Sequence, residues 1–171
     1  MSVSLAQQQN LVAQINESRH NYITDGYTMS IGELASMYRD GEFDINSNAI
    51  NTFYWTPQQR SRLIESVLIG MPLPSIFVYQ NENGVWELID GLQRISTIFE
   101  FLGELKNEKN EKVIAPKLLK THILTSLDGM TWLELPPDLK LNFKRSKIEV
   151  KIIKNLSGDK LELIDLLRNV L

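Results

Sequence analysis

A strand–turn–strand–helix stretch in the middle of the sequence constrains the fold more than any other part. Residues 75–80 and 85–90 are short runs of apolar, β-branched and aromatic residues, and an Asn-Gly pair closes the segment 81–84 between them. Asn-Gly supplies the positive φ angles of a tight hairpin, so the two runs are predicted to be adjacent antiparallel strands. The second strand continues through Gly91 into a helix that is predicted to end at Gly103.

Two capping boxes begin helices on the N-terminal side of this hairpin. In Ser30-x-x-Glu33 and Thr56-x-x-Gln59, the first side chain bonds the amide of the last residue, and the last side chain bonds the amide of the first. Pro57 suits the first position of a helix, and a glycine follows each apolar stripe where a helix is expected to end. The predicted elements are helices at 31–40 and 57–69 and a brief strand at 43–45.

The C-terminal half has the same mixture of helical and extended patterns. Residues 104–112 are dense in charge and are predicted to form a solvated loop or hairpin tip. The stretch 113–135 is ambiguous and is expected to hold short helices, with Trp132 and Leu133 turned inward. The remaining predicted elements are a helix from Pro136 to about residue 145, a strand over 148–152 and a helix from Asp159.

Together these elements predict an α+β fold in which helices pack on a mixed sheet. Residues 1–27 are mostly polar and are expected to form an N-terminal arm, followed by one domain at 28–155. Residues 156–171 are expected to be the start of a truncated helical segment whose apolar face is only partly covered within this chain. The partner expected for that face is a downstream segment or a second copy of the chain. Its apolar residues are Leu161, Ile164, Leu167 and Val170.

Composition excludes several kinds of site. The chain of 171 residues has no cysteine and two histidines, which excludes disulfides and zinc ribbons and disfavours a His/Cys metal site. With 18 Lys and Arg against 21 Asp and Glu, the net charge is −3, whereas proteins that grip nucleic acid over their whole surface are strongly basic. No apolar run is long enough to span a bilayer, and the polar N-terminus does not resemble a signal peptide. A cytoplasmic protein without a membrane partner is expected.

A candidate anion site lies where the second hairpin strand meets the following helix. Gly91 allows the backbone to approach a ligand closely, and the unpaired amides at a helix N-terminus attract anions. Arg94 adds a charged fork suited to phosphate, Gln93 adds neutral donors and Thr97 adds a hydroxyl. Asp90, at the strand tip, has the chemistry to hold a divalent cation such as Mg²⁺ or to position a water molecule. The alternative is that Asp90-Gly91 is simply a turn and helix cap, with Arg94 solvated.

A second group of residues surrounds the start of the helix at 57–69. Trp55 has a ring that can stack on a nucleobase, Arg60 has a charge that can meet phosphate, and Glu65 follows roughly a turn later. The alternative is that Trp55 belongs to the core and that Arg60 lies on a solvated helix face.

Four motifs resemble, in order and spacing, the N-terminal domain family of GmrSD-type restriction endonucleases, within the ParB/sulfiredoxin-like superfamily. The resemblance is strongest over residues 43–103 and is compatible from 28 to 155. The family's loop usually reads Asp-Gly-Gln-Gln-Arg, and Leu92 stands at its third position here. The motifs are Trp55-x-Pro57-x-Gln59-Arg60, Leu63-Ile64-Glu65-Ser66, Gly70-Met71-Pro72-Leu73-Pro74 and Asp90-Gly91-x-Gln93-Arg94.

The resemblance implies a ParB/sulfiredoxin-like α+β fold that binds and hydrolyses a nucleoside triphosphate, in a bacterial system that restricts phage DNA. A separate HNH-type nuclease domain or subunit would cut the DNA, and DNA would be met through the full-length protein. With the residue chemistry above, Asp90, Arg94 and Glu65 are the expected catalytic residues. The residues expected to bind nucleotide are Gly91, Gln93, Arg94, Thr97, Trp55 and Arg60.

Two other functions stay open at this stage. One is a non-hydrolytic DNA-binding module on the same fold, for which Lys144, Arg145 and Lys147 form the densest basic cluster. A solvated helix face explains that cluster equally well. The other is a protein-interaction module without catalysis.

Overall fold

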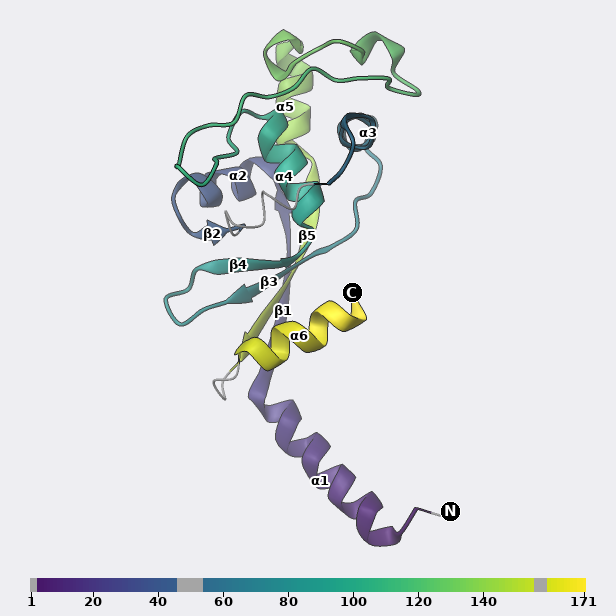
Figure 1. The fold of residues 1–171 in the computed structure, drawn as a ribbon, viewed down its shortest axis with the longest axis vertical. Coiled ribbons are helices and arrows are strands. Elements are labelled where there is room, and N and C mark those ends of the chain that lie inside the picture. The colour runs from purple at the N-terminus through teal and green to yellow at the C-terminus, as the bar shows by residue number, and fades with distance from the viewer. Residues whose placement is uncertain (1–2, 46–53, 156–159) are drawn as a thin grey trace.

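The computed structural model describes residues 3–45, 54–155 and 160–171 (Figure 1). Helices and strands are mixed along the chain without strict alternation, since β3 is followed directly by β4, and this agrees with the α+β prediction. The helices are α1 (Leu5–Asn21), α2 (Ile31–Arg39), α3 (Pro57–Ile69), α4 (Leu92–Phe101), α5 (Pro137–Arg145) and α6 (Lys160–Val170). The strands are β1 (Tyr22–Ser30), β2 (Phe43–Asp44), β3 (Ile76–Gln80), β4 (Trp86–Asp90) and β5 (Lys147–Asn155).

The strands form one mixed sheet in the order β1-β5-β3-β4-β2. β1 pairs with β5 and β3 pairs with β4 in antiparallel fashion, whereas β3–β5 and β4–β2 are parallel pairs. The predicted hairpin is therefore confirmed as β3 and β4. Parallel pairing of β5 with β3 needs the long crossover that carries α4 and α5. This crossover places β5 between β1 and β3 in the sheet.

The hydrophobic core lies on one face of the sheet, under α2, α3, α4 and α5 (Figure 1). Successive residues of a strand point to opposite faces, so Val78 is fully buried in this core while Tyr79 belongs to a second cluster. That second cluster also contains Phe77, Ile89 and Leu167, and it lies between the sheet and α6. The two faces of β3 and β4 are thus covered by different helices.

Local sequence signals placed most elements correctly. Both predicted capping boxes are present, and α3 spans the predicted residues 57–69. Residues 104–112 form the expected hairpin tip, closed by an isolated bridge between Lys106 and Lys112. Two short 3₁₀ helices, Thr125–Leu127 and Trp132–Glu134, occupy the ambiguous stretch.

The prediction that Leu133 turns inward together with Trp132 is wrong for Leu133. Trp132 packs edge-on against Phe101 and also meets Phe143, whereas Leu133 is 82% exposed. The reason is geometric, because adjacent residues of a short helical turn point in different directions and one face alone meets the core.

The N-terminal strand β1 is an element that the sequence analysis did not predict. It occupies the edge of the sheet, is paired along its whole length with β5, and leaves most of its side chains exposed. Because most side chains of β1 are exposed, its sequence lacks the alternation of apolar and polar residues that predicts a strand. The boundary expected between arm and domain, at residues 27 and 28, falls inside this strand. α1 precedes it as a helix with no buried residue that projects away from the sheet (Figure 1).

The C-terminal helix α6 has the partly covered apolar face that its sequence predicts. Leu167 packs on the second cluster and Ile164 is half-buried, but Leu161 and Val170 are each 78% exposed. An ion pair between Lys160 and Glu87 holds the start of the helix to β4. The contacts of Lys160 and Leu167 therefore hold the helix to the sheet.

We expect Leu167→Ala to loosen α6, because removing a partly buried leucine forfeits a share of the roughly 1.5–3 kcal/mol that full burial contributes. Hydrogen exchange of the amides in 160–170 should become several-fold faster. Leu161→Ala is the matched control, since Leu161 is mostly exposed on the same helix. Equal exchange rates in the two variants would contradict the assigned docking contact.

Candidate functional site

The candidate site is built at the junction of β4 and α4. β4 ends at Asp90, and Gly91 follows in the left-handed region, with φ 104° and ψ 14°, as the N-cap of α4. A Cβ atom on Gly91 would lie 2.6 Å from Cγ2 of Ile76, a fully buried residue. Both the backbone angle and the close approach thus require glycine at this position. Gly91 also leaves the first amides of α4 without a side-chain cap.

Arg94 lies across this junction and is held from two sides. Its Nη2 donates to the carbonyl oxygen of Ser75 at 3.0 Å and to Oδ2 of Asp90 at 3.2 Å. Its Nε is buried and has no hydrogen-bond partner among the described residues. The side chain of Arg94 is 19% exposed and that of Asp90 is 42% exposed. The ion pair is therefore open to solvent mainly on the Asp90 side.

These residues line a pocket of about 270 Å³. Part of its wall is polar and includes Asp90, Gln93 and Arg94, and the rest is mainly aromatic or aliphatic. The backbone N–H of Trp55 donates to Oε1 of Gln93 at 3.2 Å, which joins the segment before α3 to the first turn of α4. The complete lining is Tyr54, Trp55, Ile89, Asp90, Gly91, Leu92, Gln93 and Arg94. The structure thus brings together five of the expected site residues, with Trp55 arriving from a separate segment.

Thr97 lies one turn further along α4 and points away from solvent. It is 2% exposed, and its hydroxyl donates to the carbonyl oxygen of Gln93 at 2.7 Å. This bond reinforces the first turn of the helix. Thr97 is not part of the pocket lining.

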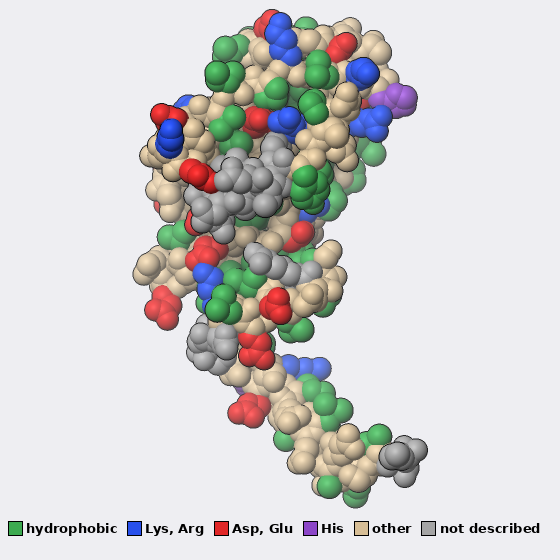
Figure 2. Space-filling view, viewed as in Figure 1, with side chains coloured by type: hydrophobic (Ala, Val, Ile, Leu, Met, Phe, Trp, Pro, Cys, Tyr) green, Lys and Arg blue, Asp and Glu red, His purple; other side chains and the backbone are tan. Residues whose placement is uncertain are grey.

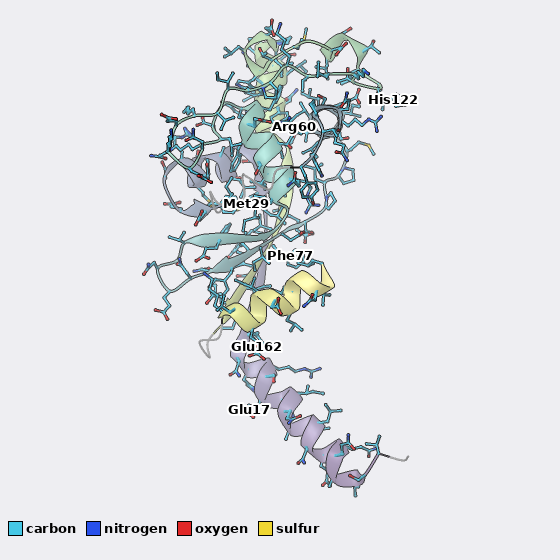
Figure 3. The ribbon with its side chains drawn as sticks, viewed as in Figure 1. Glu17, Met29, Arg60, Phe77, His122 and Glu162 are labelled. Carbon is cyan, nitrogen blue, oxygen red and sulfur yellow. The ribbon has the colours of Figure 1, made fainter. Side chains whose placement is uncertain are left out.

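Arg60 also lies outside the pocket, in the helical layer above the sheet (Figure 3). Its Nη1 donates to both carboxylate oxygens of Glu100, at 3.0 and 2.8 Å, and the pair joins α3 to α4. Both side chains are largely buried, Arg60 at 19% and Glu100 at 9% exposed. Burial raises the pKa of Glu100 above its ordinary value, and the charge of Arg60 offsets part of that rise. The guanidinium of Arg60 is therefore paired with Glu100 in a contact that stabilises the packing of α3 on α4.

Glu65 holds a loop of the chain and does not line the pocket. It is 4% exposed, and its carboxylate accepts from the backbone N–H groups of His122, Ile123 and Leu124 at 3.0, 2.6 and 2.5 Å. Burial by itself acts to raise the pKa of Glu65, but the three backbone hydrogen bonds outweigh it and lower the pKa. The carboxylate is thus kept ionised and bound to the segment around His122, at the edge of the molecule in Figure 3.

Ser75, Tyr54 and Ile89 belong to the site and were not expected from the sequence. Ser75 contributes its backbone carbonyl, which every residue type has, so no side-chain pattern could mark it. Tyr54 and Ile89 are neighbours of Trp55 and Asp90 along the chain. Their adjacency to expected site residues was the one signal that pointed to them.

Other kinds of site find little support in the described parts of the chain. These parts contain no group of three His, Cys, Asp or Glu residues placed to hold a metal ion, and no helix in them is long and apolar enough to cross a membrane. On the face shown in Figure 2, acidic and basic side chains are mixed and do not gather into a patch of one sign. Lys144, Arg145 and Lys147 are exposed at the end of α5 and the start of β5.

The fold and the pocket define an α+β domain whose strand–glycine–helix junction carries an aspartate and an arginine beside an aromatic wall. The family model of the GmrSD restriction endonuclease N-terminal domain matches residues 52–169, which is more than half of the chain. The chain belongs to this family of restriction endonuclease N-terminal domains, as its four motifs predict. Membership makes it part of a restriction endonuclease, a class of enzyme that acts on DNA. No curated protein and no solved structure matches the chain.

Proposed function

We propose that this domain binds a nucleoside triphosphate at the head of α4 and hydrolyses it, as the sensor domain of a bacterial DNA-restriction protein. An HNH-type nuclease domain or subunit would then cut the DNA. The observation that carries the proposal is the pocket in which Gly91, Asp90 and Arg94 meet at a helix N-terminus.

Phosphate chemistry suits the polar wall of this pocket. A helix N-terminus offers amide donors and a partial positive charge, and Gly91 leaves them without a competing side-chain cap. Arg94 is the one cation among the described lining residues, and its guanidinium is a planar fork that matches phosphate oxygens. The helix dipole and Arg94 thus favour an anion at the same point.

A nucleobase suits the other wall. Trp55 adds an aromatic ring and Ile89 an aliphatic side chain to the lining of the same pocket, and stacking of a base on an aromatic ring is worth about 1–3 kcal/mol. The hydrogen bond from the backbone N–H of Trp55 to Gln93 joins the aromatic part of the lining to the polar part. A ligand with a flat apolar end and an anionic end would therefore fill the pocket.

Hydrolysis would depend on positioning and charge stabilisation. Asp90 is the carboxylate nearest to the bound phosphates in this proposal, and it would orient the attacking water or a divalent cation such as Mg²⁺. Glu65 and Arg60 are assigned to the fold, because the carboxylate of Glu65 is bound by three amides and Arg60 is paired with Glu100.

Arg94→Ala is expected to weaken nucleoside triphosphate binding by tenfold or more, because a charge-assisted hydrogen bond contributes about 1.5–3 kcal/mol. Arg94→Lys should recover part of the loss, since lysine keeps the charge but not the fork. Calorimetric titration with a panel of nucleoside triphosphates measures binding, and phosphate release measures turnover.

Arg62→Ala is the matched control, because Arg62 is exposed on α3 outside the pocket and its loss changes the net charge by the same amount. Unchanged affinity of the Arg94→Ala variant for every triphosphate bound by the wild type would overturn the assignment of this pocket. A wild-type protein that binds none of them would overturn the proposed function.

A further inference from the structure

We infer that Asp90 makes this pocket selective for a triphosphate complexed with a divalent cation and against the metal-free triphosphate. The inference rests on the proposed function and concerns which form of the ligand the site accepts. Its basis is the contact between Asp90 and Arg94 in the pocket.

Asp90 occupies the place of a ligand anion on Arg94. Nη2 of Arg94 divides its two donors between Oδ2 of Asp90 and the carbonyl oxygen of Ser75, at 3.2 and 3.0 Å. The carboxylate belongs to the residue just before the N-cap Gly91, where the helix dipole also favours negative charge. An incoming phosphate that takes Nη2 must therefore displace or share the position that the carboxylate of Asp90 holds.

The formal charges of the described side chains that line the pocket sum to zero, so the helix N-terminus alone is left to attract a polyanion. Among its described lining residues, Asp90 and Arg94 are the two charged groups, and their charges cancel. A metal-free triphosphate brings several negative charges next to Asp90, and like charges at short range repel. The ligand must also compete with that carboxylate for Arg94.

A divalent cation on the phosphates reverses the role of Asp90. Carboxylate oxygens are preferred ligands of Mg²⁺, which commonly joins one or two carboxylates to the phosphates of a nucleotide. Asp90 is 42% exposed, so its carboxylate can turn to such a cation without opening the core. Arg94 is then released toward the phosphates. One residue thereby penalises the free anion and favours its metal complex.

The test compares wild type with Asp90→Asn, using the β,γ-imido analogue of the nucleoside triphosphate that binds tightest, with excess EDTA or with excess Mg²⁺. The wild type should bind at least tenfold more tightly with Mg²⁺. Asp90→Asn should bind the metal-free analogue about tenfold more tightly than the wild type does, and the gap between the two conditions should close. Thermal melting of each variant verifies that it is folded.

Glu82→Gln is the matched control, because it changes the net charge equally from the exposed turn between β3 and β4. It should leave both affinities unchanged, which separates a local contact from the overall charge. If Asp90→Asn weakens binding in EDTA as well as in Mg²⁺, Asp90 is a simple binding residue, and the inference fails while the proposed function stands. Failure of the wild type to bind under either condition overturns both.

Discussion

Gly91→Val is expected to abolish triphosphate binding and to lower the free energy of unfolding by about 2–5 kcal/mol. A side chain in the left-handed region costs roughly 1–2 kcal/mol, and more for a β-branched residue. Overpacking adds roughly 1–3 kcal/mol, because the new Cβ would lie 2.6 Å from Cγ2 of Ile76 in the core. It would also lie 3.2 Å from Nη2 of Arg94, so the guanidinium must move.

Chemical denaturation measures the loss of stability, and two comparisons separate its causes. Gly103 has a φ of +72°, but a Cβ there would meet nothing within 4 Å. Gly103→Ala thus carries the backbone strain alone, whereas Gly91→Ala carries the strain and the clash. Leu92→Gln alters the same loop without either cost and should retain binding. Equal stability of Gly91→Ala and Gly103→Ala would show that the contact with Ile76 is not restrictive.

Glu65→Ala is expected to destabilise the fold by about 3–5 kcal/mol without acting on the pocket directly. The substitution leaves the part-buried N–H groups of His122, Ile123 and Leu124 without their acceptor, and each costs about 1 kcal/mol or somewhat more, the lower end of the range for an unsatisfied donor. The loop 121–124 should then exchange its amide hydrogens faster. Glu17→Ala, on the exposed face of α1, is the control and should change stability little.

The stabilisation from Glu65 also depends on pH, with a defined sign. Its pKa in the folded protein lies below the ordinary value of 4.5, so the carboxylate stabilises the fold fully above that value. The stabilisation is lost as pH falls below 4.5 and through the lowered pKa. The difference in unfolding free energy between wild type and Glu65→Ala should therefore shrink in acid. A difference that stays constant from pH 7 to pH 3 would contradict the hydrogen-bonded, ionised state of Glu65.

Capping chemistry explains why so many elements were predictable. Thr56, Pro57 and Gln59 fix the start of α3 through contacts within four residues of chain, and Gly70 ends it in the left-handed region with a φ of 86°. The turn from Asp90 through Gly91 into α4 is equally local. Such signals depend only on residues that are close together in the chain, so they can be recognised from the sequence alone.

Long-range contacts explain what the sequence could not reveal. Arg60 was expected to meet phosphate, but the fold sets it against Glu100, forty residues away. Glu65 was expected near the reacting groups, but it binds the amides of the loop at 122–124. Arginine and glutamate each suit a binding site as well as a structural contact. The packing of α3 on α4 and on that loop decides which partner each side chain meets.

The sequence by itself determined the α+β class, the β3–β4 hairpin, the limits of α3, and the Asp90–Gly91–Arg94 turn, because each depends on neighbouring residues. Only the tertiary structure decided that β1 closes the edge of the sheet, that Trp55 faces Gln93, and that Arg94 rests on the carbonyl of Ser75. Those contacts use backbone amides and carbonyls, which are the same in nearly every residue. Their pairing is therefore fixed by chain topology and core packing rather than by any local pattern of side chains.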